Sequence, residues 1–228
     1  MLHGYGASLL EGAGLTLAMA FGSLAVALVL GLAGAAAKLS RRPLLRGAAQ
    51  VYTTLIRGVP DLVMMLLVFY GGQVLVNQVA ERLGMEYVDV NPFVAGVGTI
   101  GFMFGAYFTE IFRGAVLAVP PGQREAAQAF GMSPWQVMWR VVGPQMLRHA
   151  LPPLSNTWLV MIKSTAIVSL IGLSDLMQRA ATASGSTREP FLFYGAAALM
   201  YLAFTSVSEL LFAWAARRLA IGVRRVAL

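Results

Sequence analysis

The 228-residue sequence contains no cysteine and few charged residues. Without cysteine the chain forms no disulfide and offers no thiolate to a metal ion. Charged residues make up 12% of the chain, about half of the proportion usual in soluble domains. This scarcity, together with an apolar content of 58%, leaves no room for a separate soluble domain. It predicts a protein that crosses a membrane several times.

The sequence also lacks the arrangements that support catalysis or nucleotide binding. Residues 31–40 contain glycines, Lys38 and Ser40, but not in the G-x4-G-K-[ST] order of a phosphate-binding loop. The two histidines, His3 and His149, are too far apart to suggest a metal site. No serine–histidine or paired-aspartate set falls on facing spans. We therefore expect this chain to be neither an enzyme nor the holder of a cofactor.

Five apolar stretches are long enough to cross a bilayer, which takes about 20 helical residues. They are residues 12–37, 62–79, 92–119, 154–173 and 191–216. Each must be helical, because hydrocarbon offers the backbone no hydrogen-bond partner. A shorter helix should precede the second span and end near Pro60, which lacks a backbone donor. We predict an all-α integral membrane protein with one domain over residues 1–228.

Basic residues gather in the segments after the first, third and fifth spans. They are Lys38, Arg41, Arg42, Arg46, Arg124, Arg140, Arg148, Arg217, Arg218, Arg224 and Arg225. The other side holds only Arg82, Arg179 and Arg188. Since cytoplasmic loops carry the excess of lysine and arginine, we expect the N-terminus outside and the C-terminus inside. The net charge of +7 then reflects topology, and we expect no nucleic-acid partner.

A polar segment, residues 120–153, separates the third span from the fourth. Residues 124–130 are mostly good helix formers, and Gly131 stands where a left-handed helix cap is common. Ser133 and Pro134 then restart a helix, as N-cap and first helical residue. The pattern predicts a short helix, a turn and a second helix outside the membrane.

The first of these helices has Ala126, Ala127 and Phe130 on one face, which suits insertion into a groove of a partner protein. A helix resting on lipid headgroups has the same features, so the residues alone leave both interpretations open. Glu125 is compatible with two roles, which do not exclude each other. It is a favourable acid in the first helical turn or a contact to the partner.

The same segment resembles the cytoplasmic signature of ABC importer permeases, E-A-A-x3-G-x9-I-x-L-P. The matching residues are Glu125, Ala126, Ala127, Gly131 and Pro144, with Val141 in place of isoleucine and Gly143 in place of leucine. In that family the loop is a coupling helix that docks on an ATPase subunit. The resemblance implies this role for Glu125, Ala126, Ala127, Phe130 and Gly131.

Further segments extend the likeness over nearly the whole chain, to the histidine and polar amino-acid branch of these permeases. They are residues 38–40, 52–63, 105–115, 163–170, 186–191 and 222–224. The resemblance implies half of a heterodimeric permease in a bacterial inner membrane. A cytoplasmic ATPase dimer would hold the ATP and magnesium, and a periplasmic solute-binding protein would deliver the amino acid.

Histidine or basic amino acids are the implied cargo. Opines and general polar amino acids are alternatives, because permeases for them share these motifs. A self-sufficient, ion-coupled secondary transporter is a rival of another class. Such folds commonly show internal repeats, and this sequence shows no similarity between its halves.

Charged side chains inside spans are costly, and they face bundle interiors or water-filled cavities. Glu110 and Arg113 lie three residues apart and can pair on one helix face. Alternatively, Glu110 faces the translocation path and meets a cationic substrate. Lys163 is expected near the middle of the fourth span. Its candidate partners are a substrate carboxylate, Glu209 on the neighbouring span, and helix carbonyls.

Three further polar residues are candidates for the pathway or its gate. Arg57 and Asp61 flank the break at Pro60. Irregular backbone at membrane depth is tolerated where it borders protein or a cavity, so a gate is one interpretation and a turn at the cytoplasmic surface is the other. Asn156 lies within the fourth span.

Overall fold

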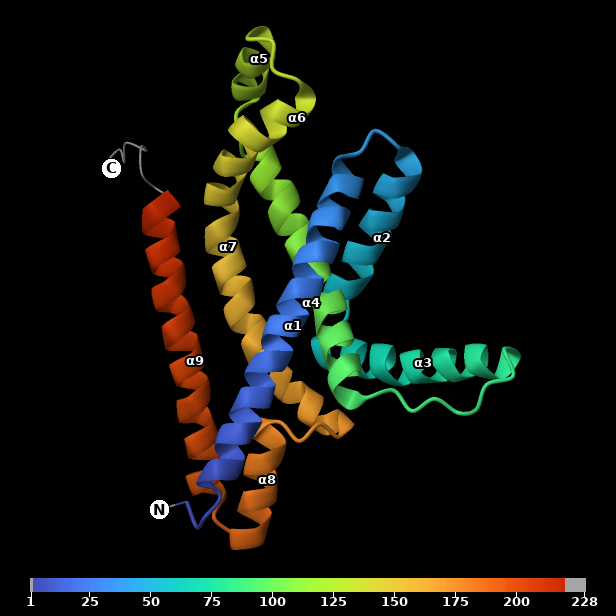
Figure 1. Cartoon of the computed structure of the whole chain (residues 1–228), viewed down its shortest axis with the longest axis vertical. Coiled ribbons are helices and arrows are strands. Elements are labelled where there is room, and N and C mark those ends of the chain that lie inside the picture. The colour runs from blue at the N-terminus through green and yellow to red at the C-terminus, as the bar shows by residue number, and fades with distance from the viewer. Residues whose placement is uncertain (1, 220–228) are drawn as a thin grey trace.

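The structure is a computed structural model that describes residues 2–219. Over this range it is built from helices and contains no strand (Figure 1). The α-helices are α1 (Gly6–Leu39), α2 (Pro43–Gly58), α3 (Asp61–Arg82), α4 (Pro92–Leu117), α5 (Pro121–Ala129), α6 (Pro134–Gln136), α7 (Gly143–Ser164), α8 (Leu176–Thr187) and α9 (Pro190–Leu219). A π-helical turn, η1 (Val137–Val142), precedes α7, and a 3-10 helix, η2 (Thr165–Ile171), follows it.

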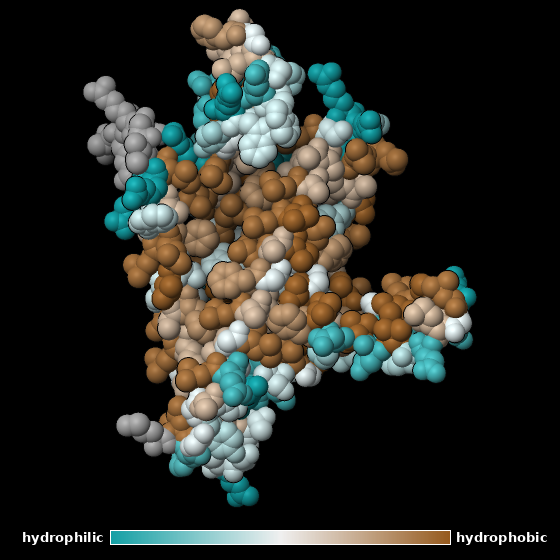
Figure 2. Space-filling view, in the orientation of Figure 1, coloured by the Kyte–Doolittle hydropathy of each residue, from teal (hydrophilic) through white to brown (hydrophobic). Residues whose placement is uncertain are grey.

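Five helical segments are long and apolar enough to cross a membrane. They are Gly6–Leu39, Asp61–Arg82, Pro92–Leu117, Pro134–Ile171 and Pro190–Leu219. The predicted all-α fold with five spans is therefore confirmed. Apolar residues cover the middle of the molecule, and hydrophilic residues gather towards its two ends (Figure 2).

The fourth span begins earlier than the sequence predicts. Residues 143–153 belong to α7, which continues through Pro152 and Pro153. Each proline removes one backbone donor, yet the helix persists because its next turns are held in the core by Leu154 and Trp158, which are buried. The indole N–H of Trp158 also donates to the Ser208 hydroxyl of α9, at 3.0 Å. Tertiary packing here outweighs the local cost of the prolines.

Helices α1 and α4 form the centre of the fold, and glycines let them approach closely. A Cβ atom added at Gly31 of α1 would lie 2.5 Å from the Cβ of Phe108. One added at Gly101 of α4 would lie 2.5 Å from the Cβ of Val26. Small residues at such contacts favour close helix packing in membranes. Phe104 and Phe108 fill the core beside them and are almost completely buried.

Helix α3 departs from this bundle and extends sideways, across the direction of the other long helices (Figure 1). Residues 83–91 return along it as an irregular segment. Two amide side chains of α3 hold that return segment. Gln73 donates to the carbonyl of Val88 at 2.6 Å and accepts from the N–H of Val90 at 3.0 Å. Asn77 accepts from the N–H of Val88 at 2.8 Å.

The short helices lie at opposite ends of the molecule. Helices α5 and α6 form one end, and α8 lies at the other, beside the beginning of α1 (Figure 1). The first and last described residues are likewise far apart, as an odd number of spans requires. The tail arginines Arg224 and Arg225, which contributed to the predicted orientation, lie outside the described residues.

Candidate functional site

The polar segment folds as predicted around two helix caps. Helix α5 ends at a left-handed Gly131, with φ of +78°, and the N–H of Met132 reaches back to the carbonyl of Ala127 at 3.1 Å. Ser133 caps the next helix in a capping box with Gln136. The N–H of Ser133 donates to the Gln136 side chain at 2.8 Å. Helix α5 begins at Pro121, ahead of the predicted start at residue 124, because proline suits the first helical position.

The predicted common face of α5 is wrong in one respect. Phe130 is 86% exposed, and Ala126 is exposed as well. Ala127, however, is buried in a small cluster with Val119, Val137 and Val142. Ala127 thus anchors α5 to the end of α4 and to η1, while Phe130 points away from the chain. Sequence spacing placed these residues on one helical face, but Phe130 lies in the cap, where the helix has already ended.

Glu110 is paired with two cations. Its carboxylate accepts from the Nε of Arg113 at 3.0 Å, which confirms the predicted pair. It also accepts from the ammonium of Lys38, which the sequence placed in a loop. Lys38 instead lies buried in the last turn of α1.

The ammonium of Lys38 has two further acceptors on α2. They are the Gln50 carbonyl oxygen at 2.9 Å and the Thr53 hydroxyl at 2.6 Å. The network therefore joins α1, α2 and α4 at a buried point. The only local sign in the sequence that Lys38 is buried is its position directly after a long apolar run.

Arg57 and Asp61 meet a residue that the sequence analysis did not single out. The guanidinium of Arg57 lies over the ring of Tyr107, 5.6 Å from its centroid. The hydroxyl of Tyr107 donates to Asp61 at 3.5 Å, the limit of a hydrogen bond. One tyrosine of α4 thus contacts both sides of the break between α2 and α3.

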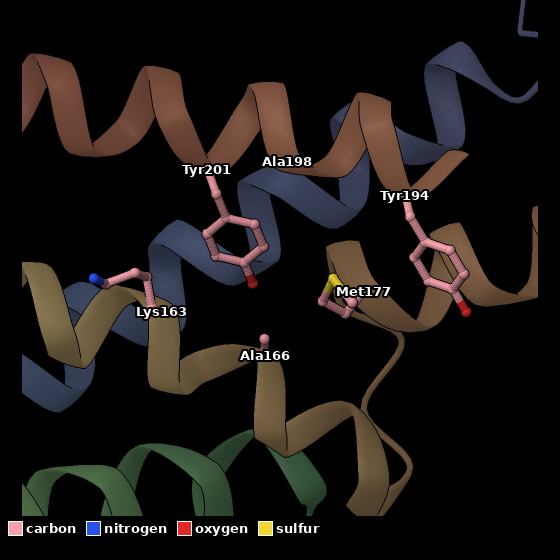
Figure 3. Close-up of a pocket in the computed structure, with 6 residues that line it drawn as sticks. All are labelled: Lys163, Ala166, Met177, Tyr194, Ala198 and Tyr201. Carbon is pink, nitrogen blue, oxygen red and sulfur yellow. The ribbon is translucent and has the colours of Figure 1, made fainter. Parts of the chain in front are cut away.

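Lys163 lies at the edge of a pocket of about 280 Å³ between α7, η2, α8 and α9. Figure 3 shows Lys163 and Ala166 on one side of this pocket and Ala198 and Tyr201 on the other. Met177 and Tyr194 complete the lining. Lys163 belongs to the last turn of α7 rather than to the middle of a regular span, because the helix tightens to 3-10 geometry directly after it.

One of the three candidate partners of Lys163, Glu209, does not pair with it. Over residues 2–219 no ion pair joins Lys163 to Glu209, which lines a separate pocket with Leu151 and Ser155. Asn156 is exposed on α7 and does not line the Lys163 pocket. Within the same range no group of three or more histidine, aspartate or glutamate residues is arranged to hold a metal ion.

Comparisons with known proteins agree with this architecture. Residues 27–221 match the family described as binding-protein-dependent transport system inner membrane component. The chain is 49% identical to the histidine/lysine/arginine/ornithine transport system permease protein HisQ of Escherichia coli, over 99% of both chains. It is 46% identical to the nopaline transport system permease protein NocQ of Agrobacterium fabrum, over 90% of this chain and 88% of that one.

Two solved structures share the fold. The crystal structure of an amino acid ABC transporter with histidines superposes with a TM-score of 0.80 at 33% identity, covering 94% of this chain and 95% of that one. An inward-facing MetNI methionine ABC transporter gives a TM-score of 0.74 at 18% identity, covering 96% and 99%. The chain therefore belongs to the binding-protein-dependent transport system inner membrane components, as a multi-pass protein of the bacterial inner membrane.

Proposed function

We propose that this chain is a permease subunit of an ATP-driven importer for histidine and basic amino acids. It forms half of the pathway, beside a homologous second permease subunit. A cytoplasmic ATPase dimer holds the ATP and magnesium, and a periplasmic binding protein delivers the substrate. The support is the 49% identity to a histidine/lysine/arginine/ornithine permease over the full length of both chains. Membership of the family favours this role over the ion-coupled alternative.

The observation that carries the coupling role is the construction of α5. Its cap presents Phe130 with 86% of its surface exposed, at one extreme end of the molecule (Figure 1). An aromatic side chain held outward by a left-handed glycine suits a pocket in a partner protein. Glu125 and Ala126 are exposed on the same helix and complete the proposed contact to the ATPase.

The attachment of α5 explains how motion would pass into the membrane. The cluster around Ala127 joins α5 to Val119 after α4 and to Val142 before α7. The Arg124 guanidinium also donates to the carbonyl of Val116, at 3.3 Å. A displacement of α5 by the ATPase is therefore transmitted to both spans at once. We expect α4 and α7 to tilt together when the ATPases close.

Within the membrane, Lys163 is the stronger candidate for the substrate pathway. Its ammonium has no ion pair inside residues 2–219, and it lies at the edge of a pocket with two tyrosines. A substrate carboxylate would supply a counter-ion for this ammonium. Glu110 is already paired with Lys38 and Arg113, which favours a structural role. Arg57 and Asp61 would act as a gate through their shared contact to Tyr107.

The test of the cargo is ATPase activity of the reconstituted complex with its binding protein, across a panel of amino acids. Histidine, arginine, lysine and ornithine should stimulate hydrolysis most. Nopaline and octopine belong in the same panel, because the similarity to a nopaline permease makes opine transport the second candidate. Stimulation by opines alone would replace the proposed substrate class while leaving the importer mechanism intact.

The coupling assignment is tested by Gly131→Asp. This substitution places a side chain and a charge at a left-handed cap, which L residues rarely adopt without strain, and beside the proposed docking surface. Gly84→Asp is a matched control, since Gly84 is also a left-handed cap, with φ of +69°, at the end of α3. Uptake should fall at least tenfold for Gly131→Asp alone, with both variants inserted in the membrane. Normal ATP-coupled uptake by Gly131→Asp would refute the docking role.

A further inference from the structure

Asp175 is a buried carboxylate that the transport mechanism above does not use. It has no exposed surface and caps the N-terminus of α8, a helix at the end of the molecule opposite to α5 (Figure 1). One carboxylate oxygen caps the helix and accepts from the N–H of Gln178 at 2.9 Å. The other oxygen, Oδ2, is buried and has no hydrogen-bond partner. A buried charged oxygen without a donor is costly.

The backbone before Asp175 turns at a left-handed glycine, and the backbone after it packs closely on α1. The 3-10 helix η2 ends at Gly172, a left-handed residue with φ of +92°. Helix α8 then packs on α1, where Gly12 leaves only enough room for the backbone of Leu176. The hydroxyl of Thr16 accepts from the N–H of Leu176 at 3.2 Å. The start of α8 is thus held on α1 by close packing, by this hydrogen bond and by the bonds of Arg179 to Ser8 and Glu11, next to the unpartnered oxygen.

The charged groups around Asp175 are engaged elsewhere, and one titratable group, a tyrosine, lies near it. On α8, Arg179 donates to Glu11 of α1 at 2.8 Å, and to Ser8 and Ser174. On α9, the hydroxyl of Tyr201 lies 3.4 Å from that of Thr165 and close enough to Asp175 to interact with it electrostatically. Helix η2 contributes no charged residue. Lys163 of α7 extends away from Met177, the second residue of α8 (Figure 3). Burial, rather than a counter-ion, therefore has the largest effect on how readily Asp175 ionises.

We propose that Asp175 is a proton-binding site that controls the docking of α8 on α1. When Asp175 is protonated, Oδ2 becomes a neutral hydroxyl and the buried charge disappears. Burying this neutral group costs less than burying a charged oxygen. The remaining oxygen still caps α8. When Asp175 is ionised, its charge is relieved only if α8 moves and water reaches Oδ2. Since the proposed orientation puts α8 outside, external acidity would hold this end of the pathway closed.

The direction of the pH dependence follows from the site. Burial raises the pKa of Asp175 from 3.8 to about 6. Between pH 3.8 and about pH 6, Asp175 therefore keeps its proton in the docked state, whereas it is already ionised in the open, hydrated state. Docking is strongest below pH 4, weakens as the pH rises through 6, and stays weak above it. Because the pKa of Asp175 differs by about two between the open and docked states, the docking equilibrium can change by up to about a hundredfold.

The test uses thiol labelling, because the chain has no cysteine of its own. Ala180 and Ala183 of α8 are fully buried, whereas Ser186 on the same helix is exposed. Ala180→Cys and, independently, Ala183→Cys are labelled in the solubilised transporter complex between pH 5 and pH 8. The rate is divided by that of Ser186→Cys at each pH, which corrects for the pH dependence of an exposed thiol on the same helix.

The normalised rate should rise at least tenfold between pH 5 and pH 8, with its midpoint near 6. Asp175→Asn keeps the cap and cannot ionise, so in that background the rate should stay low at every pH. His3→Gln is the control, because His3 pairs with Glu189 at the same end, at 3.0 Å. That variant should retain the full pH response.

A flat profile with either buried cysteine would overturn the proposal, and so would an unchanged profile in Asp175→Asn. Loss of the response in His3→Gln would reassign the switch to the His3–Glu189 pair. The labelling needs neither transport nor a known substrate. Its failure would leave the proposed importer function untouched, and a failed substrate assay would leave this result standing.

Discussion

At the scale of single residues, the carboxylate of Glu110 determines how three helices meet. It lies on α4 and accepts from Arg113 on the same helix and from Lys38 at the end of α1. The side chain of Lys38 is only 4% exposed, so its charge has little access to water. Two neutral acceptors on α2 complete its surroundings. A single uncharged substitution at Glu110 would leave this ammonium buried without a counter-ion.

Glu110→Gln should therefore destabilise the protein, by about 3–5 kcal/mol if it behaves as a broken buried ion pair. Complex yield should fall, and uptake of arginine and of glutamine should fall by the same factor. Glu81→Gln, at an exposed acid near the end of α3, should change neither. The pair Lys38→Met with Glu110→Leu should recover part of the yield, since it removes both charges. Normal yield with a selective loss of arginine uptake would show instead that Glu110 faces the substrate.

Gly31→Ala tests the close approach of α1 and α4. The added Cβ would lie 2.5 Å from the Cβ of Phe108 and 3.1 Å from its backbone carbon, so the helices must separate. Overpacking of this kind costs about 1–3 kcal/mol. Gly14→Ala is the control on the same helix, where nothing lies within 4 Å. Thermal unfolding in detergent should show a lower midpoint for Gly31→Ala alone, and equal midpoints would mean that α4 yields without cost.

The residue pairs that the sequence could predict are those close along the chain. Glu110 and Arg113, three residues apart on one helix, were predicted and are paired. Ser133 and Gly131 were predicted as caps because capping depends on neighbouring residues. Lys38 with Glu110 was missed, as was Tyr107 with Arg57. Those contacts depend on how α1, α2 and α4 are arranged, which no local pattern contains.

At the scale of elements, composition predicted which segments are helical, but not their directions. Helix α3 has the length and hydropathy of a span, yet it lies across the other long helices (Figure 1). Its return segment has no regular backbone pairing, so amide side chains supply the partners that its N–H and carbonyl groups require. Gln73 and Asn77 are four residues apart, about one helical turn, and therefore both reach the return segment of residues 83–91.

Asn77→Leu should loosen this segment without unfolding α3. It removes the acceptor of the Val88 N–H and one donor to the Val88 carbonyl, each worth about 1 kcal/mol. Hydrogen exchange of residues 85–91 should accelerate about tenfold or more. Gln78→Leu, at an exposed neighbour on the same helix, should leave exchange unchanged. Similar acceleration in both variants would show that the effect comes from the added leucine.

At the scale of the whole molecule, the predicted orientation depends on charge that is distributed unevenly between two ends. The end formed by α5 and the start of α2 carries Arg41, Arg42, Arg46 and Arg124. The opposite end, around α8, carries Arg179, which pairs with Glu11 at 2.8 Å, and Arg188, which caps the end of α8. The excess of basic residues at the α5 end predicts, by the positive-inside rule, that this end lies in the cytoplasm. The same orientation would bring α5 to the ATPases and α8 to the binding protein.

Single cysteines test this orientation directly, because no native cysteine competes for the reagent. Positions 85, 186, 43 and 128 are all exposed in the fold, so accessibility depends on the side of the membrane rather than on burial. A membrane-impermeant thiol reagent should label Met85→Cys and Ser186→Cys in intact cells. Pro43→Cys and Gln128→Cys should react only after permeabilisation. A fifth site at position 222 lies outside the described residues and should behave like position 43. Labelling of position 128 from outside would reverse the predicted orientation, and it would refute the assignment of α5 to a cytoplasmic ATPase.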